Sequence, residues 1–282
     1  MTDTNIECVS QGIYEHIPTE DVVGYLAREN SLLAWAIDGA STLTESPFTT
    51  YEDLTDAGWF SRAVAGLLEV EFHESPFDLT AFHSGLRSLR EQYLLDAGVA
   101  PSQSAWPVAA AMIMEIDQTT SGTLQIRSYR YADCFALVSQ KMVQQKPSVA
   151  IPVPQGPTEY DPWKPFSGFL GNALEDLLHR RCQQQRNEFS TALTLNPVSV
   201  WNAIETRLTV RTPAHILLGS DGLSRIWDTY RIMTSDQAMD VVVQQSLPSL
   251  MQLLRTYEAS SSSRPKGIKR RDDACGIHIS LT

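Results

Sequence analysis

Runs of hydrophobic residues that end in an aspartate are the clearest pattern in this chain. Residues 32–39 read Leu-Leu-Ala-Trp-Ala-Ile-Asp-Gly, with a single charge at Asp38. A short apolar run closed by glycine predicts an interior strand followed by a turn, which leaves Asp38 at the strand terminus. Residues 216–222 repeat this design and end at Asp221 and glycine, whereas residues 272–280 reverse it, with two aspartates before an apolar run. The pattern therefore predicts strand-end carboxylates that the fold brings together.

Periodicity elsewhere predicts further elements. Apolar residues recur at steps of three and four through residues 79–93, as on the buried face of an amphipathic helix. Runs 108–116 and 124–131 are joined by a polar segment with a glycine, which is typical of a hairpin, and 134–139 is predicted to extend it into a three-stranded meander. The other predicted elements are strands at 5–10 and 21–26 and helices at 58–69, 172–187 and 235–257, the last broken at Pro248.

A further helix is expected to start at Asn196-Pro197, with asparagine as the cap and proline in the first turn. Val198, Trp201 and Ile204 would form its buried face. Residues 40–57 are polar and are predicted to form a loop or lid, and residues 145–166, which contain six prolines, are predicted to run over the surface.

The strands cluster as hairpins instead of alternating regularly with helices, and this favours an α+β fold with antiparallel sheets. The chain has 282 residues, which is enough to bury a full core. It contains no internal repeat and no linker that divides it. Residues 1–282 are therefore predicted to form a single domain.

Composition narrows the choice of partners. The net charge of −11 disfavours a nucleic-acid backbone or an anionic membrane as the main partner, and no stretch of about 18 apolar residues predicts a transmembrane helix. The first five residues lack the basic and apolar regions of a signal peptide. The four cysteines are far apart, with no Cys-x-x-Cys, so they are predicted to be reduced thiols. These features together predict a cytoplasmic protein.

Oxygen ligands at strand ends suit Mg²⁺ or Mn²⁺. Two such ions about 3.5–4 Å apart can bridge a hydroxide and orient a phosphate for in-line attack. A glycine after the aspartate lets the backbone carbonyl approach the metal. A single Asp-Gly is usually only a turn, so the argument depends on several matching strand ends.

The order of these motifs resembles that of the metal-dependent PP2C-type protein phosphatases, in particular their short, bacterial-type members, over nearly the whole chain. The matching segments are Thr19-Glu20-Asp21-Val22, Ala36-Ile37-Asp38-Gly39, Tyr131-Ala132-Asp133-Cys134, Leu218-Gly219-Ser220-Asp221-Gly222 and Arg271-Asp272-Asp273-Ala274. The resemblance implies an α-β-β-α sandwich, in which two antiparallel β-sheets are flanked by helices. It also implies hydrolysis of phosphoserine or phosphothreonine by a metal-bridging hydroxide.

The resemblance assigns a role to each motif. Asp38 would bridge two Mn²⁺ or Mg²⁺ ions and the carbonyl of Gly39 would bind one of them. The first aspartate of the last motif, Asp272, would be the ligand there, as Asp221 is in its own motif. Glu20 or Asp21 would bind metal-bound water, and Asp133 can hold a third ion.

Two departures from the family pattern concern the substrate. Family members often continue Asp-Gly with His-Gly-Gly, whose histidine can protonate the leaving group, but here Ala40-Ser41-Thr42 follows. Members also often carry an arginine shortly before the Glu-Asp segment to bind the phosphate, but there is none between residues 1 and 27. His16 is therefore the candidate catalytic acid, with a metal-bound water as the other option, and the metals, His16 or a distant arginine would bind the phosphate.

Three functions stay open at this stage. The first is a metal-dependent phosphatase of a phosphorylated protein, the target of a serine/threonine kinase, with no nucleic-acid or membrane partner. The others are a catalytically weak or inactive binding module on the same fold, and a hydrolase of small phosphate esters.

The basic run 264–271 either forms a solvated loop or adds positive potential beside Asp272. The sequence leaves the substrate and the oligomeric state open.

Overall fold

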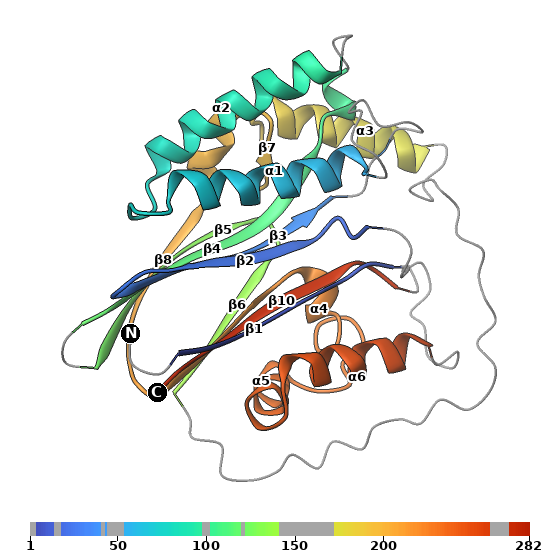
Figure 1. Cartoon of the computed structure of the whole chain (residues 1–282). Helices are drawn as coiled ribbons and strands as arrows, with labels where there is room; N and C mark the ends of the chain where they lie inside the picture. The colour runs from blue at the N-terminus through green and yellow to red at the C-terminus, as the bar shows by residue number, and fades with distance from the viewer. Residues whose placement is uncertain are drawn as a thin grey trace.

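Two antiparallel β-sheets pack face to face with helices on both outer faces, as the computed structural model shows (Figure 1). The structure describes residues 4–13, 18–40, 43, 54–97, 102–119, 122–140, 172–259 and 271–282. This arrangement is the predicted α-β-β-α sandwich.

The first sheet has the strand order β2-β3-β4-β5-β8, and a short strand, β7, also pairs with β4. Its strands are β2 (Val22–Ala27), β3 (Ser31–Gly39), β4 (Val108–Gln118), β5 (Thr123–Tyr131), β7 (Leu193–Thr194) and β8 (Ile204–Arg211). Helices α1 (Asp56–Glu71) and α2 (Leu79–Asp96) cover its outer face (Figure 1). The 3₁₀ helices η1 (Gln103–Ala105) and η2 (Pro197–Asn202) and helix α3 (Asn172–Gln185) complete this half.

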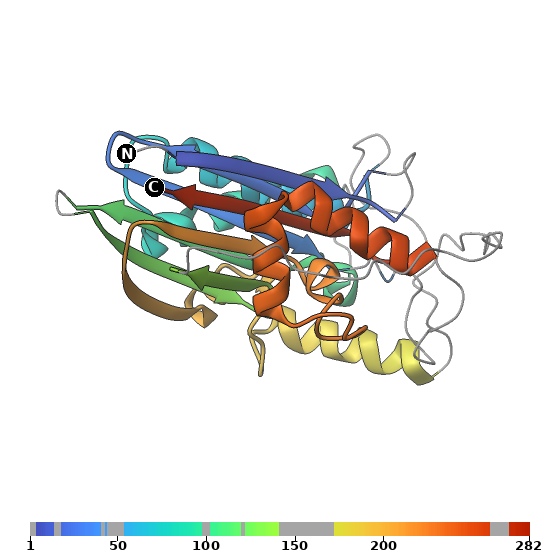
Figure 2. The ribbon, with the colours of Figure 1, turned by 90° about the horizontal axis from the view of Figure 1, so that it is seen from below.

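The second sheet has the order β1-β10-β9-β6. Its strands are β1 (Thr4–Gln11), β6 (Phe135–Ser139), β9 (Ala214–Gly219) and β10 (Ala274–Leu281). Helices α5 (Ser235–Gln244) and α6 (Leu247–Ala259) lie on its outer face, and the one-turn helix α4 (Asp221–Ser224) follows β9 (Figures 1 and 2).

Side chains along β3 alternate between the two faces of its sheet, and both faces are buried. Leu33, Trp35 and Ile37 belong to the core under α1 and α2, whereas the residues between them face the second sheet. A strand covered on both faces must be apolar throughout, which explains the continuous hydrophobic run in the sequence. The one charged residue of this strand is Asp38, next to the last position of the strand.

Four of the predicted elements need correction. Helix α1 begins at Asp56, where the hydroxyl of Thr55 caps it, and not at residue 58. The predicted meander is wrong, because β6 leaves the sheet of β4 and β5 and pairs with β9 in the other sheet. The chain changes sheets at Ala132, whose φ is 55°. The break in the long C-terminal helix lies at residues 245–246, and Pro248 is already inside α6.

The element at Asn196-Pro197 is the short 3₁₀ helix η2 and not an α-helix. Asn196 does cap it, through a hydrogen bond from the amide of Val198 to its side chain. However, Val198, Trp201 and Ile204 are 47, 52 and 45% exposed, so the predicted buried face is wrong. The buried residues are Pro197, Ser199 and Val200, because the helix is tighter than 3.6 residues per turn.

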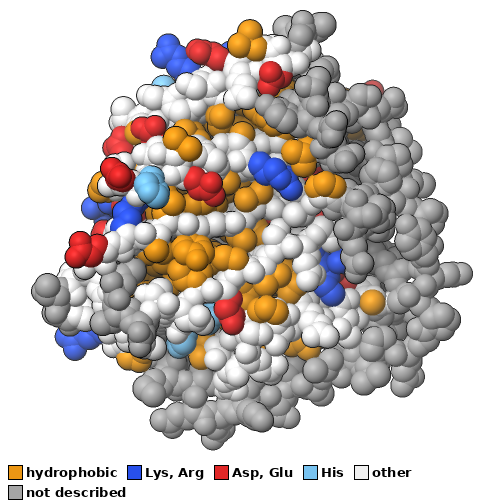
Figure 3. All heavy atoms as spheres, in the orientation of Figure 1, with side chains coloured by type: hydrophobic (Ala, Val, Ile, Leu, Met, Phe, Trp, Pro, Cys, Tyr) orange, Lys and Arg blue, Asp and Glu red, His pale blue; other side chains and the backbone are white. Residues whose placement is uncertain are grey.

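Hydrophobic side chains are visible on the face of the molecule where β1 and β2 lie in front (Figures 1 and 3). These two strands are edge strands of their sheets, and Tyr25 on β2 is 45% exposed.

All four cysteines are free thiols, as predicted, and no described helix is long and apolar enough to span a membrane.

Candidate active site

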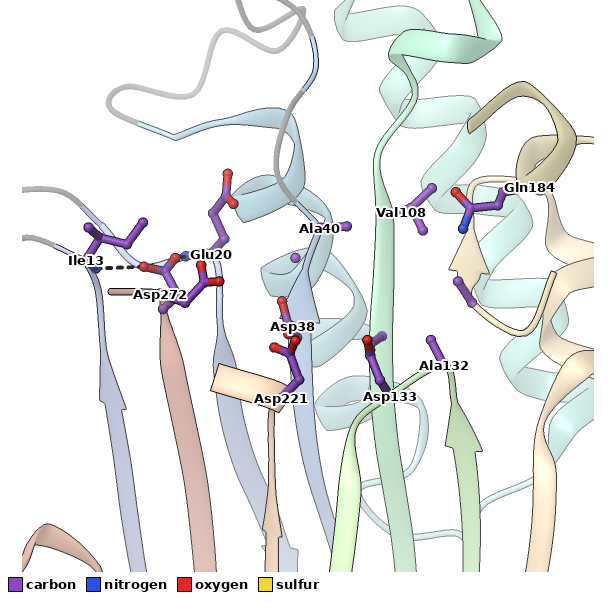
Figure 4. Close-up of a pocket in the computed structure, with 14 residues that line it drawn as sticks. Ile13, Glu20, Asp38, Ala40, Val108, Ala132, Asp133, Gln184, Asp221 and Asp272 are labelled. Atoms are coloured by element: carbon purple, nitrogen blue, oxygen red, sulfur yellow. Dashed lines mark hydrogen bonds between the residues drawn. The ribbon is translucent and has the colours of Figure 1, made fainter. Parts of the chain in front are cut away.

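One cavity of about 270 Å³ lies where the ends of several strands meet (Figure 4). Carboxylates from all five motifs that the sequence singled out line it, and Asp133 does so from the turn between β5 and β6. Its acidic lining residues are Glu20, Asp38, Asp133, Asp221, Asp272 and Asp273. The fold therefore gathers the predicted strand-end carboxylates into one place.

Asp38 and Asp221 are in direct contact at the centre of this cluster. Asp38 ends β3, Asp221 begins α4, and their side chains point toward one another in Figure 4. Their carboxyl groups are close enough to shift each other's pKa. Burial raises the pKa of Asp38 well above its ordinary value, and the charges of Asp21 and Asp221 raise it further. Burial likewise raises the pKa of Asp221.

Asp21 is only 2% exposed and its charge acts on Asp38, although it does not itself line the cavity. Neither of its carboxylate oxygens makes a well-formed hydrogen bond to a described residue. Burial raises its pKa from the ordinary 3.8 to about 8; the nearby Ser220 opposes this rise, and the charges of Asp273 and Asp221 add to it. Buried carboxyl groups that lack a balancing positive charge hold a proton more tightly, which is the physical cause of this shift.

Gly39 continues β3 in a place where only glycine fits. A Cβ there would lie 2.9 Å from the carbonyl oxygens of both Ala57 and Glu20. The amide of Gly39 donates to the carbonyl of Glu20 at 3.3 Å. The close approach fixes the end of β3 between the Glu-Asp segment and α1, and so aligns Asp38 with the rest of the cluster.

Asp273 is a site residue that the sequence reasoning missed. Its carboxylate accepts the amides of Ile13 at 2.8 Å and of Glu20 at 2.6 Å, so it ties together the chain on either side of residues 14–17. The neighbouring Asp272 lines the cavity and lies 3.5 Å from Nη1 of Arg225. The available signal was the adjacent pair of acidic residues, but the sequence does not say which aspartate faces the cavity and which binds backbone amides.

Arginines lie near the cavity even though the N-terminal segment has none. Arg62 on α1 donates to the carbonyls of Gly58 and Thr19, at 2.8 and 2.9 Å, close to the charges of Asp273 and Glu20. Arg181 on α3 is near Glu20, and burial lowers its pKa to about 10. Sequence spacing could not find these arginines, because both come from helices that are distant in the chain.

Several predicted features lie outside the described residues. They are His16, most of the predicted lid at 40–57, the segment 145–166 and the basic run up to residue 270. Among the described residues that line the cavity there is no histidine, and Ala40 follows the Asp-Gly motif. In the described part of the chain, no three His, Cys, Asp or Glu side chains already form a set spaced to hold a metal ion. The carboxyl groups of Asp38 and Asp221 instead lie close together, and the charge of Asp221 adds to the effect of burial in raising the pKa of Asp38.

No protein-family model and no curated protein matches the sequence. Solved structures do match it over almost its whole length. The serine/threonine phosphatase Stp1 from Staphylococcus aureus is 12% identical to this chain, with a TM-score of 0.53. The match covers 100% of this chain and 96% of the Stp1 chain. PppA of Pseudomonas aeruginosa is 15% identical with a TM-score of 0.53, over 98% of this chain and 97% of its own.

A third match is the catalytic domain of the serine/threonine protein phosphatase PstP in complex with two manganese ions. It is 12% identical with a TM-score of 0.52 and covers 98% of this chain and 97% of its own. At these identities the likeness concerns the fold, and it agrees with the sandwich that the sequence motifs predicted. The chain therefore has the fold of the PP2C-type serine/threonine phosphatases.

Proposed function

We propose that this protein is a metal-dependent phosphatase that hydrolyses phosphoserine and phosphothreonine in proteins. One observation carries the proposal: acidic side chains from five separate segments, four of which contribute aspartates and one Glu20, converge on a single cavity in a PP2C-type fold. The solved structures of similar fold include PstP with two manganese ions and RsbX with magnesium. Such ions fit the oxygen-rich donor set of this cavity.

The donor set supports this assignment on electrostatic grounds. The carboxyls of Asp21 and Asp38 both have raised pKa values, first because they are buried and then because other carboxylates surround them. A divalent cation would supply the positive charge that this cluster otherwise obtains by keeping protons. Asp38, the carbonyl of Gly39, Asp221 and Asp272 would hold two ions, and Asp133 would hold a third.

The bound ions would activate a water molecule and neutralise the phosphate, which is the chemistry that the side chains alone do not supply. The chain itself would position the reactants. Glu20 lines the cavity, and its carboxylate accepts a hydrogen bond from Thr55, so it is held where it can accept a proton from a water molecule. Asp273 holds the backbone of Glu20 through the amide at 2.6 Å. No covalent phospho-enzyme is required in this scheme.

The test of the proposal is phosphate release from p-nitrophenyl phosphate and from phosphopeptides, measured with Mn²⁺, with Mg²⁺ and with EDTA. The expected result is turnover that depends on the ion and is abolished by EDTA. Faster turnover of small phosphorylated metabolites than of phosphopeptides would instead favour a hydrolase of small esters. A folded protein with no turnover and no Mn²⁺ binding would contradict the proposal and leave a binding module.

Affinity for Mn²⁺ is expected to rise as the pH rises from 6 to 8. A cation must displace the proton that Asp21 holds up to a pKa of about 8, so binding should release protons throughout this range. If one proton leaves per ion, the affinity rises by about tenfold per pH unit. Calorimetric titration in buffers with different ionisation enthalpies measures both the affinity and the released protons. An affinity that stays constant from pH 6 to 8 would contradict the prediction.

Asp21→Asn should separate this effect from other titrating groups. The pKa of Asp21 is raised on folding, so its contribution to stability is fully present below about 3.8 and is lost as the pH rises through about 8. In EDTA, the variant should therefore gain stability relative to the wild type as the pH is raised from 5 to 8. Thermal unfolding of both proteins at the two pH values checks this; an unchanged difference would show that Asp21 does not titrate in this range.

A further inference from the structure

Arg225 is a buried cation at the border of the aspartate cluster. It directly follows α4, and only 6% of the residue is exposed. Its Nη1 lies 3.5 Å from Oδ2 of Asp272. Its backbone amide donates to the carbonyl of Asp221 at 3.0 Å, which holds the residue one turn away from that aspartate. The guanidinium therefore lies beside the carboxylate of Asp272, and its charge also acts on that of Asp221.

The guanidinium of Arg225 lies among Tyr230, Glu258 and Asp272. Its guanidinium lies over the ring of Tyr230, 5.5 Å from the centroid. The other nearby carboxylate, Glu258, already accepts a hydrogen bond from Arg255 at 2.7 Å and from the hydroxyl of Tyr230 at 3.3 Å. Arg255 is thus the hydrogen-bond partner of Glu258, on which the charge of Arg225 also acts, whereas Asp272 lies between Arg225 and the cavity that it lines.

We propose that Arg225 is a built-in counter-cation that weakens binding of the divalent ion at Asp221 and Asp272. This inference rests on the proposed function, because it concerns the same carboxylates. A fixed positive charge in a buried site repels an incoming cation, and water screens such a charge much less there than at the surface. The ion site at Asp272 would therefore fill only at higher Mn²⁺ concentration, which makes the activity graded over that range.

A guanidinium beside a ligand can also orient it and so strengthen metal binding. The geometry decides between the two effects. The contact of 3.5 Å with Asp272 is too long for a good hydrogen bond, so its orienting effect is weak. Coulomb repulsion between the guanidinium and an ion at Asp272 needs no hydrogen-bond geometry and falls only inversely with distance. Repulsion is therefore expected to outweigh orientation.

The experiment is calorimetric titration of Mn²⁺ into the full chain as wild type, Arg225→Met, Arg225→Gln and Arg225→Lys. The two neutral variants should bind the weaker ion about tenfold or more tightly than the wild type does, which is a gain of about 1.4 kcal/mol or more. Arg225→Lys keeps the charge and should keep the wild-type affinity. Two neutral side chains of different shape are used so that a packing defect in one of them, seen by circular dichroism, does not decide the result.

Neutral variants that are folded and bind Mn²⁺ as weakly as the wild type, or more weakly, would overturn the inference. Hydrolysis of p-nitrophenyl phosphate by the wild type is measured in parallel. If the wild type turns over with Mn²⁺ while the variants show no gain in affinity, the role of Arg225 is refuted and the proposed function stands. If no variant binds Mn²⁺ and the wild type does not turn over, both fail.

Discussion

Replacing Asp38 with asparagine is expected to lower Mn²⁺-dependent hydrolysis of p-nitrophenyl phosphate by about a hundredfold to a thousandfold. Asp38 ends β3 in contact with Asp221 and next to Asp21, so it is the carboxylate that both proposed ions would share. An amide has nearly the same shape but cannot carry the negative charge that binds two cations. The rate, the Mn²⁺ affinity and the far-ultraviolet circular dichroism of the variant give the full comparison.

The fold should survive this substitution. Burial raises the pKa of Asp38, so without a cation the carboxyl group keeps its proton to a higher pH than a free carboxyl does, and a neutral amide resembles that protonated form. In EDTA the variant should therefore be at least as stable as the wild type. Asp240→Asn on α5 is a suitable control, because it makes the same chemical change outside the cavity and should leave the rate unchanged. A fully active Asp38→Asn protein would remove Asp38 from the proposed site.

The strand-end aspartates could be predicted because each depends on a short local pattern. Residues 32–39 form an interior strand because both faces are covered, and this demands an unbroken apolar run whose first charge marks the end of the sheet. The same logic located Asp221 after β9 and the acidic pair before β10. The order of these motifs then predicted the sandwich that the structure shows.

The elements that sequence reasoning missed are defined by distant partners. Strand β8 is an edge strand in which nearly every residue is exposed, so it has none of the apolar periodicity that marks a buried strand. The pairing of β6 with β9 depends on the turn at Ala132, which sends the chain into the other sheet. Neither feature leaves a local signal, because register and sheet membership are set by residues far along the chain.

The electrostatic partners of the site were hidden for the same reason. Arg225 follows the Asp-Gly motif by a few residues, yet only the fold shows that its side chain returns to Asp272. The sequence analysis assigned no role to Asp273, but its carboxylate accepts the backbone amides of Ile13 and Glu20 and so joins the start of the last strand to the N-terminal segment. A sequence identifies candidate ligands by type, whereas the groups that hold or oppose them must be located in space.

Gly222→Ala is expected to destabilise the protein by about 3 kcal/mol or more, at the upper end of overpacking costs. A Cβ at this position would lie 1.8 Å from the carbonyl oxygen of Asp273 and 3.2 Å from Cα of Ala274. These are backbone atoms at the start of β10, which is paired with β1 on one side and β9 on the other, so they cannot move without breaking the sheet. Thermal unfolding should show a melting temperature lower by roughly 6–12 °C.

The same substitution should also weaken Mn²⁺ binding, because relief of the clash moves the segment that carries Asp272 and Asp273. Gly66→Ala is the matched control: the residue is inside α1, and apart from its neighbours and the backbone of that helix no atom lies within 4 Å of a Cβ there. Alanine favours a helix over glycine by about 0.5–1 kcal/mol, so this variant should be slightly more stable and bind Mn²⁺ normally. If Gly222→Ala matched the control in melting temperature and in Mn²⁺ affinity, the close packing of α4 against β10 could not be what positions the two aspartates.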